Sequence, residues 1–512
     1  MSFSQKLQLI LKTLKVTNKE LAEAIGADAS LISRWRTGDR KPTSSSPYIG
    51  KISAFITQRA GSDAQRIAIL QLVGANLSQL HCSDAAFADL VADWLATADD
   101  SQSYAGLVIG SFLHHIDSTP VTYSNGRSAN IGEIRQGELR QTEVFRGREG
   151  MQSAVLKLLR SLLDADQAIN VMAFSDQSLD WLIRDPDYLA QWTALMDQCV
   201  RQGHTLEIVH TINRELYELF AIIEKWLPYY ITDKVHPYYC PKYHESMFKR
   251  TFIAVPGICA LTSHTVAGRE ACGEYEFSSN GDKIRDTEAT LRAIMADSVP
   301  LIQCFVPQTS NRYLAYLDYH NNQPGDSIAL LYTITSHTMP ESIFSRNLKR
   351  FDFSEKKYDQ IMNLFRSNTE QFRQHLRGNT YTEVVALPPP DRFDPRRIPV
   401  DTVPYLASHP MFFERKEDFS EHLENTIRVI QEYDNYHFYL LKKPDYFNNT
   451  QIMAKKGVGV VFTKQDWTFL TFVLKEQKMT NAFIHYLNNT LDAIPEQDKD
   501  KDSVIRQLRQ YM

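Results

Sequence analysis

Apolar positions recur every three or four residues through the first 60 residues, the spacing of helices that bury one face. The first predicted helix is marked by one such stripe: Phe3, Leu7, Ile10, Leu11 and Leu14. Thr17, with Glu20 three residues later, forms a capping-box pattern that starts a second helix. Gly26 ends that helix, and its buried face is predicted to be Leu21, Ala22 and Ile25.

A third helix is predicted directly after this turn. Asp28 caps it, Gly38 ends it, and three side chains face inward: Leu31, Ile32 and Trp35. Only two residues separate Ile25 from Asp28, so the second and third helices must be joined by a tight turn. This arrangement is a helix-turn-helix. A fourth helix is expected from about Ser46 to Arg59.

The outer face of the third helix carries small and basic residues, Arg34 together with Ala29, Ser30, Ser33 and Thr37. Small residues at the helix start permit close approach to a DNA major groove, where Arg34 can bond a guanine edge through two hydrogen bonds. Three flanking cations could neutralise phosphates: Arg36, Arg40 and Lys41. Asn18, at the start of the second helix, is expected to point its amide and backbone N–H at the same strand.

The stretch TNKELAEAIGADASLISRWRTGDRKP resembles the lambda-repressor-like (Cro/C1, or XRE) helix-turn-helix family, over roughly residues 4–60. The glycine of the turn, LISRW and G-x-R-x-P stand where that family has them. The resemblance implies a phosphate contact at Asn18 and base-reading positions at Ala29, Ser30, Ser33 and Arg34. Ala29 departs from the polar residue often found there. The alternatives are a charged helical hairpin, or a helix-turn-helix used for protein contacts.

Charge is distributed unevenly along the chain. Residues 1–60 contain ten Lys and Arg against four acidic residues, a net charge of +6, whereas the remainder contains 46 against 57, a net charge of −11. A basic head on an acidic body indicates a polyanion partner for the head alone. Residues 61–118 have apolar stripes of helices, which predict a connector or a dimerisation segment, and 119–143 is a polar, Gly-containing linker.

Helical stripes alternate with short apolar runs after Arg146, which predicts an α/β body. Residues 144–310 are expected to form one lobe, with a hairpin around Pro256–Gly257, and 311–512 a second α/β lobe. The order of elements over 144–306 looks like the phospholipase D-like fold of some bacterial regulators. The enzymes that have this fold need the motif His-x-Lys-x₄-Asp for catalysis. None of the 15 histidines in this chain is followed two residues later by Lys. The resemblance therefore implies a body that binds a ligand and catalyses nothing.

Two stretches of the body are candidates for binding a small-molecule effector. Ser175 and Asp176 follow a predicted strand, where ligands of α/β sheets bind, although capping the following turn is the commoner role of such residues. The aromatic run 226–244 could wall a pocket or simply pack between lobes; its candidate residues are Tyr229, Tyr230, His236, Tyr238 and Tyr239. His236, Cys240 and His244 have metal-ligand spacing, but two prolines interrupt any helix there, so no metal site is expected.

These features together predict a bacterial, sequence-specific transcription regulator. We expect a homodimer on double-stranded operator DNA, an effector-binding body and no cofactor, and no standard nucleotide, hydrolase or zinc motif is present. The six cysteines have no paired spacing, which predicts reduced thiols and a cytoplasmic protein. No apolar run is long enough for a membrane helix, so no membrane span is expected. The competing hypotheses are an enzyme or phage-defence factor recruited by the helix-turn-helix, and a regulator whose body binds a protein or peptide.

Overall fold

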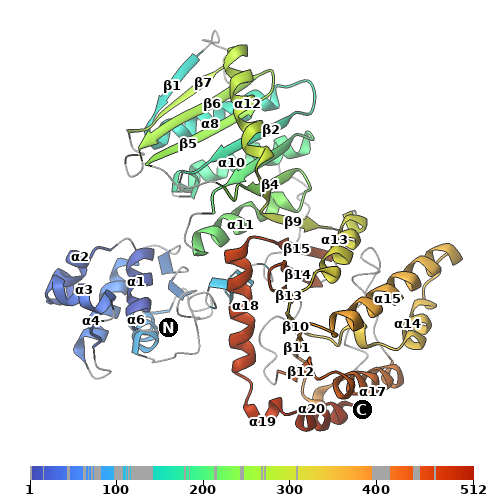
Figure 1. Cartoon of the computed structure of the whole chain (residues 1–512). Coiled ribbons are helices and arrows are strands. Elements are labelled where there is room, and N and C mark those ends of the chain that lie inside the picture. Colours follow the sequence, from blue (N-terminus) through green and yellow to red (C-terminus); the bar gives the residue numbers. More distant parts are fainter. Residues whose placement is uncertain are drawn as a thin grey trace.

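The computed structural model covers an N-terminal helical region and an α/β body with two mixed sheets (Figure 1). The residues that it describes are 3–14, 16–37, 39–42, 46–60, 65–66, 69–70, 73, 82–96, 106, 108–110, 112–113, 116, 142–177, 180–183, 185–212, 216–242, 247–266, 269, 272–306, 309–394, 415–441, 450–465 and 469–512. The expected linker 119–143 lies outside them except for its last two residues, which begin a strand. Gly38, the expected end of the third helix, also lies outside them.

The first four predicted helices of the N-terminal region, called the head below, are confirmed. They are α1 (Phe3–Thr13), α2 (Asn18–Ile25), α3 (Ala29–Thr37) and α4 (Pro47–Arg59). Thr17 and Glu20 form the expected capping box, in which the Glu20 carboxylate accepts from the Thr17 N–H at 2.7 Å, and this bond lowers the pKa of Glu20. Gly26 adopts φ +67°, a conformation that suits glycine, and so ends α2.

One further helix, α6 (Asp84–Ala96), packs against α1 and α4. Its side chains Phe87, Val91 and Leu95 belong to the same buried cluster as the apolar faces of α1–α4. The Lys6 ammonium is buried and donates to the Trp94 carbonyl at 2.6 Å, near the end of α6, where the helix dipole favours a cation. The core of the head therefore extends beyond residue 60.

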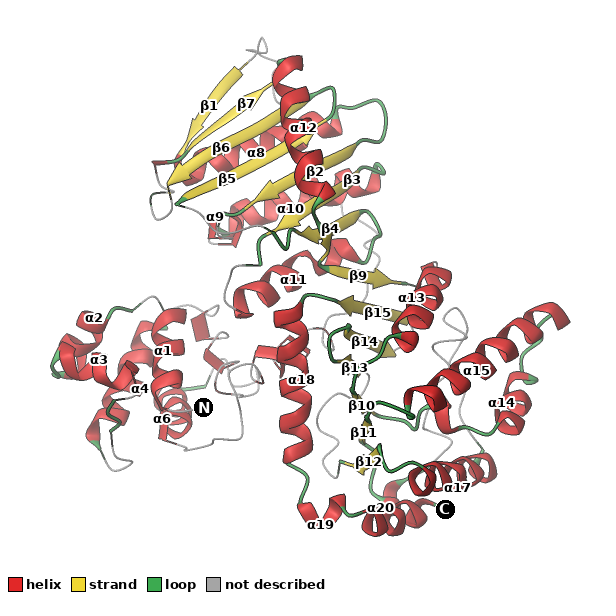
Figure 2. Cartoon of the chain, in the orientation of Figure 1, coloured by secondary structure: helices red, strands yellow, loops and turns green. Residues whose placement is uncertain are grey.

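The first sheet of the body is covered by helices on both faces (Figure 2). α8, α10 and α11 pack on one face and α12 on the other. Its elements are β1 (Thr142–Arg146), α8 (Gly147–Leu163), β2 (Asn170–Ser175), α9 (Asp180–Ile183), α10 (Pro186–Arg201), β3 (Thr205–His210), α11 (Leu216–Tyr230), β4 (Val235–Tyr239), β5 (Phe248–Val255), β6 (Cys259–Val266), β7 (Glu274–Ser278), α12 (Gly281–Ala296) and β8 (Val299–Pro300).

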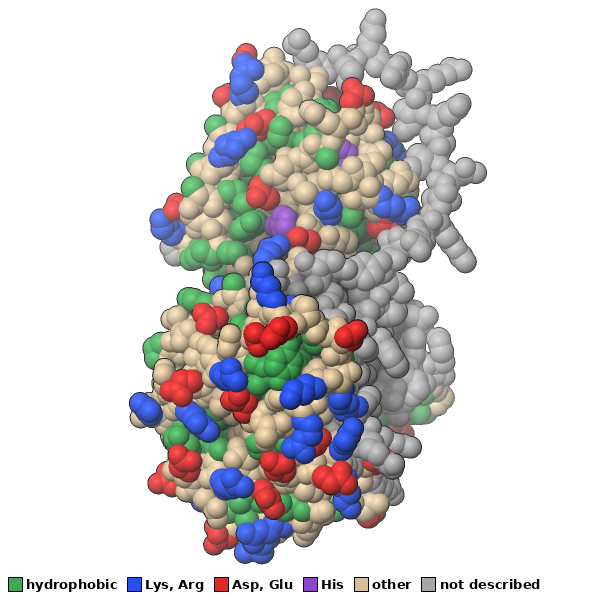
Figure 3. Space-filling view, turned by 90° about the vertical axis from the view of Figure 1, so that its right-hand side faces the viewer, with side chains coloured by type: hydrophobic (Ala, Val, Ile, Leu, Met, Phe, Trp, Pro, Cys, Tyr) green, Lys and Arg blue, Asp and Glu red, His purple; other side chains and the backbone are tan. Residues whose placement is uncertain are grey.

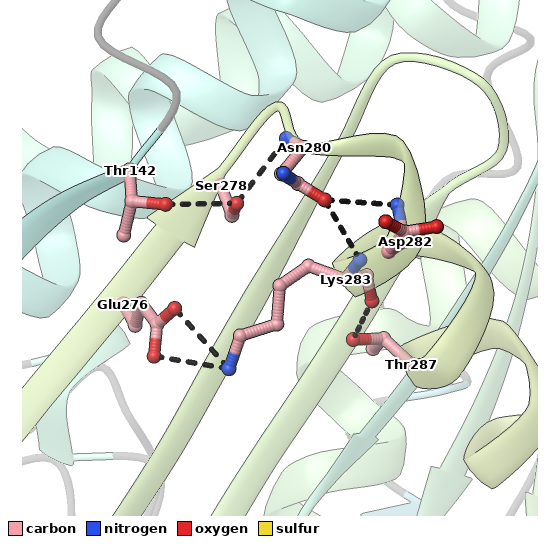
Figure 4. A network of polar contacts seen from close by, with 7 residues as sticks. All are labelled: Thr142, Glu276, Ser278, Asn280, Asp282, Lys283 and Thr287. Atoms are coloured by element: carbon pink, nitrogen blue, oxygen red, sulfur yellow. Dashed lines mark hydrogen bonds and ion pairs between the residues drawn. The ribbon is translucent and has the colours of Figure 1, made fainter.

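The start of α12 is fixed to the sheet by a polar network (Figure 4). The Asn280 side chain caps the helix by accepting from the backbone N–H of Asp282 and Lys283, at 2.9 and 3.3 Å. Lys283 also pairs with Glu276 on β7, and Ser278 hydrogen-bonds Thr142 on β1 at 3.2 Å. These contacts tie α12, β7 and β1 together.

The second sheet follows immediately in the chain, after Leu301. Its strands are β9 (Ile302–Phe305), β10 (Ser327–Leu331), β11 (Tyr381–Val385), β12 (Tyr436–Leu440), β13 (Thr450–Lys455), β14 (Gly459–Gln465) and β15 (Phe469–Leu474). Its helices are α13 (Ser310–Asn322), α14 (Glu341–Leu348), α15 (Glu355–His375), α17 (Lys416–Glu432), α18 (Gln477–Asp492), α19 (Glu496–Lys499) and α20 (Lys501–Leu508), with short 3-10 turns at Ser336–Thr338, Pro390–Arg392 and Arg509–Tyr511.

Seven strands have the same order in the two sheets, and the first sheet has β8 as an additional edge strand. The first is β1-β7-β6-β5-β2-β3-β4-β8, and the second, from its β9 edge, is β9-β15-β14-β13-β10-β11-β12. Each places three parallel strands beside three antiparallel ones. The corresponding hairpins β5–β6 and β13–β14 both turn at a glycine of φ +75°, Gly257 and Gly457. The helix after the last strand, α12 or α18, covers the corresponding face of each sheet. The body therefore consists of two structurally similar halves, one around each sheet.

A segment between the head and the first sheet lies in the core that joins the two halves of the body. Its described residues 106, 108–110, 112–113 and 116 are helical, and Phe112 and Leu113 are fully buried. The Phe112 ring lies 4.6 Å from Phe220 of α11 and 5.8 Å from Phe462 of β14. Lys464 of β14 donates to the Ile116 carbonyl at 3.2 Å. This segment thus contacts α11, which packs on the first sheet, and β14 of the second sheet.

The expected boundaries of the body differ from the structure at two points. β1 begins at Thr142 rather than at 144, because its residues pair antiparallel with β7, a partner 128 to 136 positions away. β9 belongs to the second sheet although the expected first lobe runs to 310, because it pairs with β15. No helix within the described residues is long and apolar enough to cross a bilayer.

Candidate nucleic-acid interface and effector region

The outer face of α3 is exposed as the sequence predicts. Ala29, Ser30, Ser33 and Arg34 are exposed, whereas Ile32 and Trp35 are buried and Leu31 is half-buried. Trp35 fixes the inner face because its ring makes edge contacts with Phe3 of α1, at 6.2 Å, and Tyr48 of α4, at 5.2 Å. Arg34 therefore projects from a helix that is held on its opposite side.

Ser30 is engaged by the cap of its own helix. Its backbone N–H donates to the Asp28 carboxylate at 2.7 Å, and hydrogen bonds from the Ser30 side chain and backbone lower the pKa of Asp28. A hydroxyl that donates to Asp28 still has lone pairs to accept with. Ser30 can therefore contact a donor on DNA, such as a base amino group, without giving up the cap.

Asn18 and Arg36, two expected phosphate contacts, are bonded to each other. The Arg36 guanidinium donates to the Asn18 amide oxygen at 2.5 Å, which ties the start of α2 to the end of α3. A guanidinium has five N–H donors, so this bond leaves others for a phosphate. The Asn18 amide oxygen, in contrast, is directed at Arg36 rather than outward.

Arg40 and Lys41 are exposed in the segment that leaves α3. The backbone N–H of Arg40 donates to the Arg34 carbonyl at 3.2 Å, so the chain folds back over the helix end. Basic residues at this exit lie beside the α3 face and can reach the phosphates next to a groove. On the face of the body in Figure 3, by contrast, basic and acidic side chains are interspersed.

Ser175 and Asp176, the first effector candidates, lie at the end of β2. The Ser175 hydroxyl is hydrogen-bonded to Thr251 of β5 at 3.1 Å. Asp176 is only 2% exposed, and its carboxylate accepts from the backbone N–H of Arg250. Both side chains thus have partners within the protein, and they join β2 to β5.

The aromatic run is divided between the two faces of the first sheet. Tyr229, Tyr230 and Tyr239 are buried among the α8, α10 and α11 side chains, where the Tyr230 hydroxyl bonds the imidazole of His210 at 3.0 Å. Burial raises the pKa of Tyr230, so its hydroxyl stays protonated. Tyr238 is half-buried on the α12 face, and His236 is half-buried as well. These residues pack the body and do not converge on one cavity.

A cavity of about 100 Å³ lies between α8, α10, α11 and the first sheet. Ser175 is the one effector candidate that lines it, and most other lining side chains are apolar, including Trp181, Trp192 and Trp226. This cavity was not predicted from the sequence. The available signal was the presence of three tryptophans within 46 positions of the chain, at 181, 192 and 226.

Metal-binding geometry is absent from the part of the chain that the structure describes: no three His, Cys, Asp or Glu side chains converge there. His244, the third residue of the spacing noted in the sequence, lies outside it. His236 stands on the strand β4 and Cys240 follows it, so the helical spacing has no meaning here. The six cysteines are all free thiols.

No family model matches this chain, and no curated protein matches it. Solved structures that align with it include TrmBL2, an archaeal chromatin protein with a novel mode of DNA binding (11% identity, 33% of this chain and 57% of that one, TM-score 0.24). Others are the polyphosphate kinase of Porphyromonas gingivalis (10% identity, 72% and 55%, TM-score 0.23) and Nuc, a phospholipase D family member of Salmonella typhimurium (14%, 31% and 96%, TM-score 0.22). The chain spans 57% of the length of TrmBL2.

Proposed function

We propose that this chain is a sequence-specific, double-stranded-DNA-binding transcription regulator whose body responds to a small-molecule effector. The observation that carries the proposal is the exposed α3 face, with Ser30, Ser33 and Arg34 outward, Trp35 buried behind them, and α2 joined by a tight turn. This geometry fits a helix presented to a major groove. The net charge of +6 on residues 1–60 favours the approach of DNA to the head.

Selection from a pool of random-sequence DNA duplexes tests the proposal directly. The purified full chain is expected to enrich a short motif, and the enriched duplex should bind more tightly than a scrambled one at physiological salt. Recovery of no motif, with equal binding to every duplex, would contradict sequence-specific recognition. Equal binding would instead fit a non-specific DNA-binding protein, and no binding would fit a helix-turn-helix that contacts proteins.

Arg34→Ala and Lys41→Ala are expected to weaken DNA binding in different ways. Loss of a guanine contact at Arg34 should cost about 1–3 kcal/mol and relax the preference at one base pair. Loss of a phosphate contact at Lys41 should weaken binding to all sequences and reduce the salt slope by about one. Titration of the selected duplex and of its single-base variants at several salt concentrations separates the two effects.

Arg285→Ala, which removes an exposed cation of α12 in the body, is the matched control and should leave binding unchanged. If Arg34→Ala keeps both the affinity and the sequence preference of the unmodified chain, then α3 does not read the bases.

A homodimer is expected because one small head reads too few base pairs to find a site in a genome, and pairing two heads multiplies specificity. Light scattering of the full chain with and without the selected duplex measures this. The expected result is a mass of twice 58.8 kDa, plus that of the duplex where it is present. A single 58.8 kDa chain on an enriched duplex would contradict the dimer.

A further inference from the structure

The cavity in the first half of the body has an almost entirely apolar wall. α8 contributes Val155 and Leu158, α10 contributes Trp192 and Met196, α11 contributes Trp226, and β3 contributes Ile208. Ile208 is only half-buried although it faces these helices, because the space beside it is not filled by side chains. An apolar cavity of this order stays dry, and one of about 150 Å³ accepts benzene.

The few polar groups of the wall are already paired with the protein. The hydroxyls of Ser175 and Thr251 bond each other at 3.1 Å. The imidazole of His204 accepts from the Ile169 N–H at 3.0 Å and bonds the Gln202 side chain at 3.1 Å. Cys199 is buried, and burial raises the pKa of its thiol to about 12, so it carries no charge. An ionised guest would be stripped of water here with no counter-charge, which is strongly unfavourable.

Trp226 is the exception among the lining side chains that the structure describes. Its indole N–H is buried and has no hydrogen-bond partner. A buried donor without an acceptor costs about 1–3 kcal/mol. The indole nitrogen, however, exposes almost no surface, so the cavity does not reach it, and the polar groups of a guest would find no free partner at this wall.

We infer that the cavity between α8, α10, α11 and the first sheet is a binding site for an uncharged, single-ring-sized apolar molecule. Its walls supply aromatic and aliphatic contact. The site is distinct from the predicted effector residues Asp176, Tyr229, Tyr230 and Tyr239, none of which lines it.

The position of the site gives its occupant a route to the head. Trp226 in the cavity wall and Phe220 are both on α11, and the Phe220 ring lies 4.6 Å from Phe112, in the segment between the head and the first sheet. A guest that shifts α11 would also shift this contact. The role of the guest as effector rests on the proposed function, but its binding does not.

Three probes of nearly equal size test the binding with the full chain: toluene, benzaldehyde and benzoate. Toluene and benzaldehyde should raise the unfolding temperature and change the tryptophan emission, because Trp181, Trp192 and Trp226 line the site. Toluene should bind more tightly than benzaldehyde, because the wall offers the benzaldehyde carbonyl no free donor, and benzoate should have no effect. Failure of both neutral probes, or equal binding of benzoate, would overturn the inference.

Variants of the wall locate the site. Val155→Phe fills the cavity and should abolish the response, whereas Val144→Phe, the same exchange at a position 52% exposed on β1, should leave it intact. Leu158→Ala widens the cavity and should extend binding to propylbenzene. This opposite change keeps the test decisive if Val155→Phe does not fold. A response that survives Val155→Phe, or is unaltered by Leu158→Ala, would place binding elsewhere.

A second measurement separates binding from regulation. The bound guest should change the affinity of the full chain for its selected duplex by about 10- to 100-fold, and Val155→Phe should lose this change. A guest that binds but leaves DNA affinity unaltered would refute its role as effector while leaving the binding site standing. A chain that binds the guest but no DNA would refute the proposed function alone.

Discussion

Replacing Trp35 with alanine is expected to destabilise the head by about 3–5 kcal/mol and to remove specific DNA binding. Trp35 is 2% exposed, and it holds α3 against Phe3 of α1 and Tyr48 of α4. Alanine leaves a cavity at the point where three helices meet. A 60- to 100-residue unit has a total stability of only a few kcal/mol, so most of it would be lost.

Hydrogen exchange measured by mass spectrometry on the full chain can localise this effect. Amides of residues 18–37 should lose protection in Trp35→Ala, while those of 147–163 in the body should keep it. Thr37→Ala, at an exposed position of the same helix, is the control and should change neither. Unaltered protection of 18–37 in Trp35→Ala would mean that the head core does not depend on this ring.

The head could be predicted closely from sequence because its signals are local. Capping pairs, a turn glycine and a helical apolar stripe all act within a few residues of one another. What sequence reasoning did not supply was the pairing across the head: the Arg36–Asn18 hydrogen bond spans 18 positions and the Lys6–Trp94 bond spans 88. Such contacts depend on tertiary packing, which residue periodicity does not encode.

The body shows the same division. The hairpin around Pro256–Gly257 was predicted, since its turn residues mark it. The repeated strand order was not, because it consists of pairings between distant strands such as β1 with β7 and β9 with β15. β4 was also missed, since Pro237 within it argues against a strand; its register with β3 accommodates that proline.

The effector region was the hardest part to predict. Tyr229 and Tyr230 have the composition of a pocket wall, yet neighbouring helices bury them. Whether a buried aromatic ring packs or surrounds a cavity depends on how completely its neighbours fill space, and a sequence gives residue volumes without their arrangement.

Acidification is expected to destabilise the second half of the body. His320 of α13 is fully buried, and its pKa is lowered from 6.5 to about 3, mainly by burial and in addition by the nearby Lys455, His375 and Lys475. The folded protein therefore keeps His320 neutral, whereas the unfolded chain takes up a proton below about pH 6.5. Below about pH 6.5 the free energy of unfolding therefore decreases as the pH decreases, and His320 contributes about 1.4 kcal/mol per pH unit to this decrease.

Chemical denaturation between pH 7 and pH 5 measures this slope. His320→Gln removes the titrating group while keeping an amide that can bond the Tyr316 hydroxyl, which lies 3.2 Å from the imidazole. Between pH 7 and pH 5 the free energy of unfolding of the variant should decrease by about 2 kcal/mol less than that of the unmodified chain. Lys455 does not contribute to the difference, because its lowered pKa of about 8 leaves it protonated in both states throughout.

His485→Gln, at an exposed position of α18, is the control and should keep the slope of the unmodified chain. His337, whose pKa burial lowers to about 4, remains in every variant and should leave part of the acid sensitivity in place. If His320→Gln and the unmodified chain lose stability equally on acidification, then His320 takes up its proton without unfolding. The α13 core around Tyr316 and Lys455 would then have to open to water while the rest of the body stays folded.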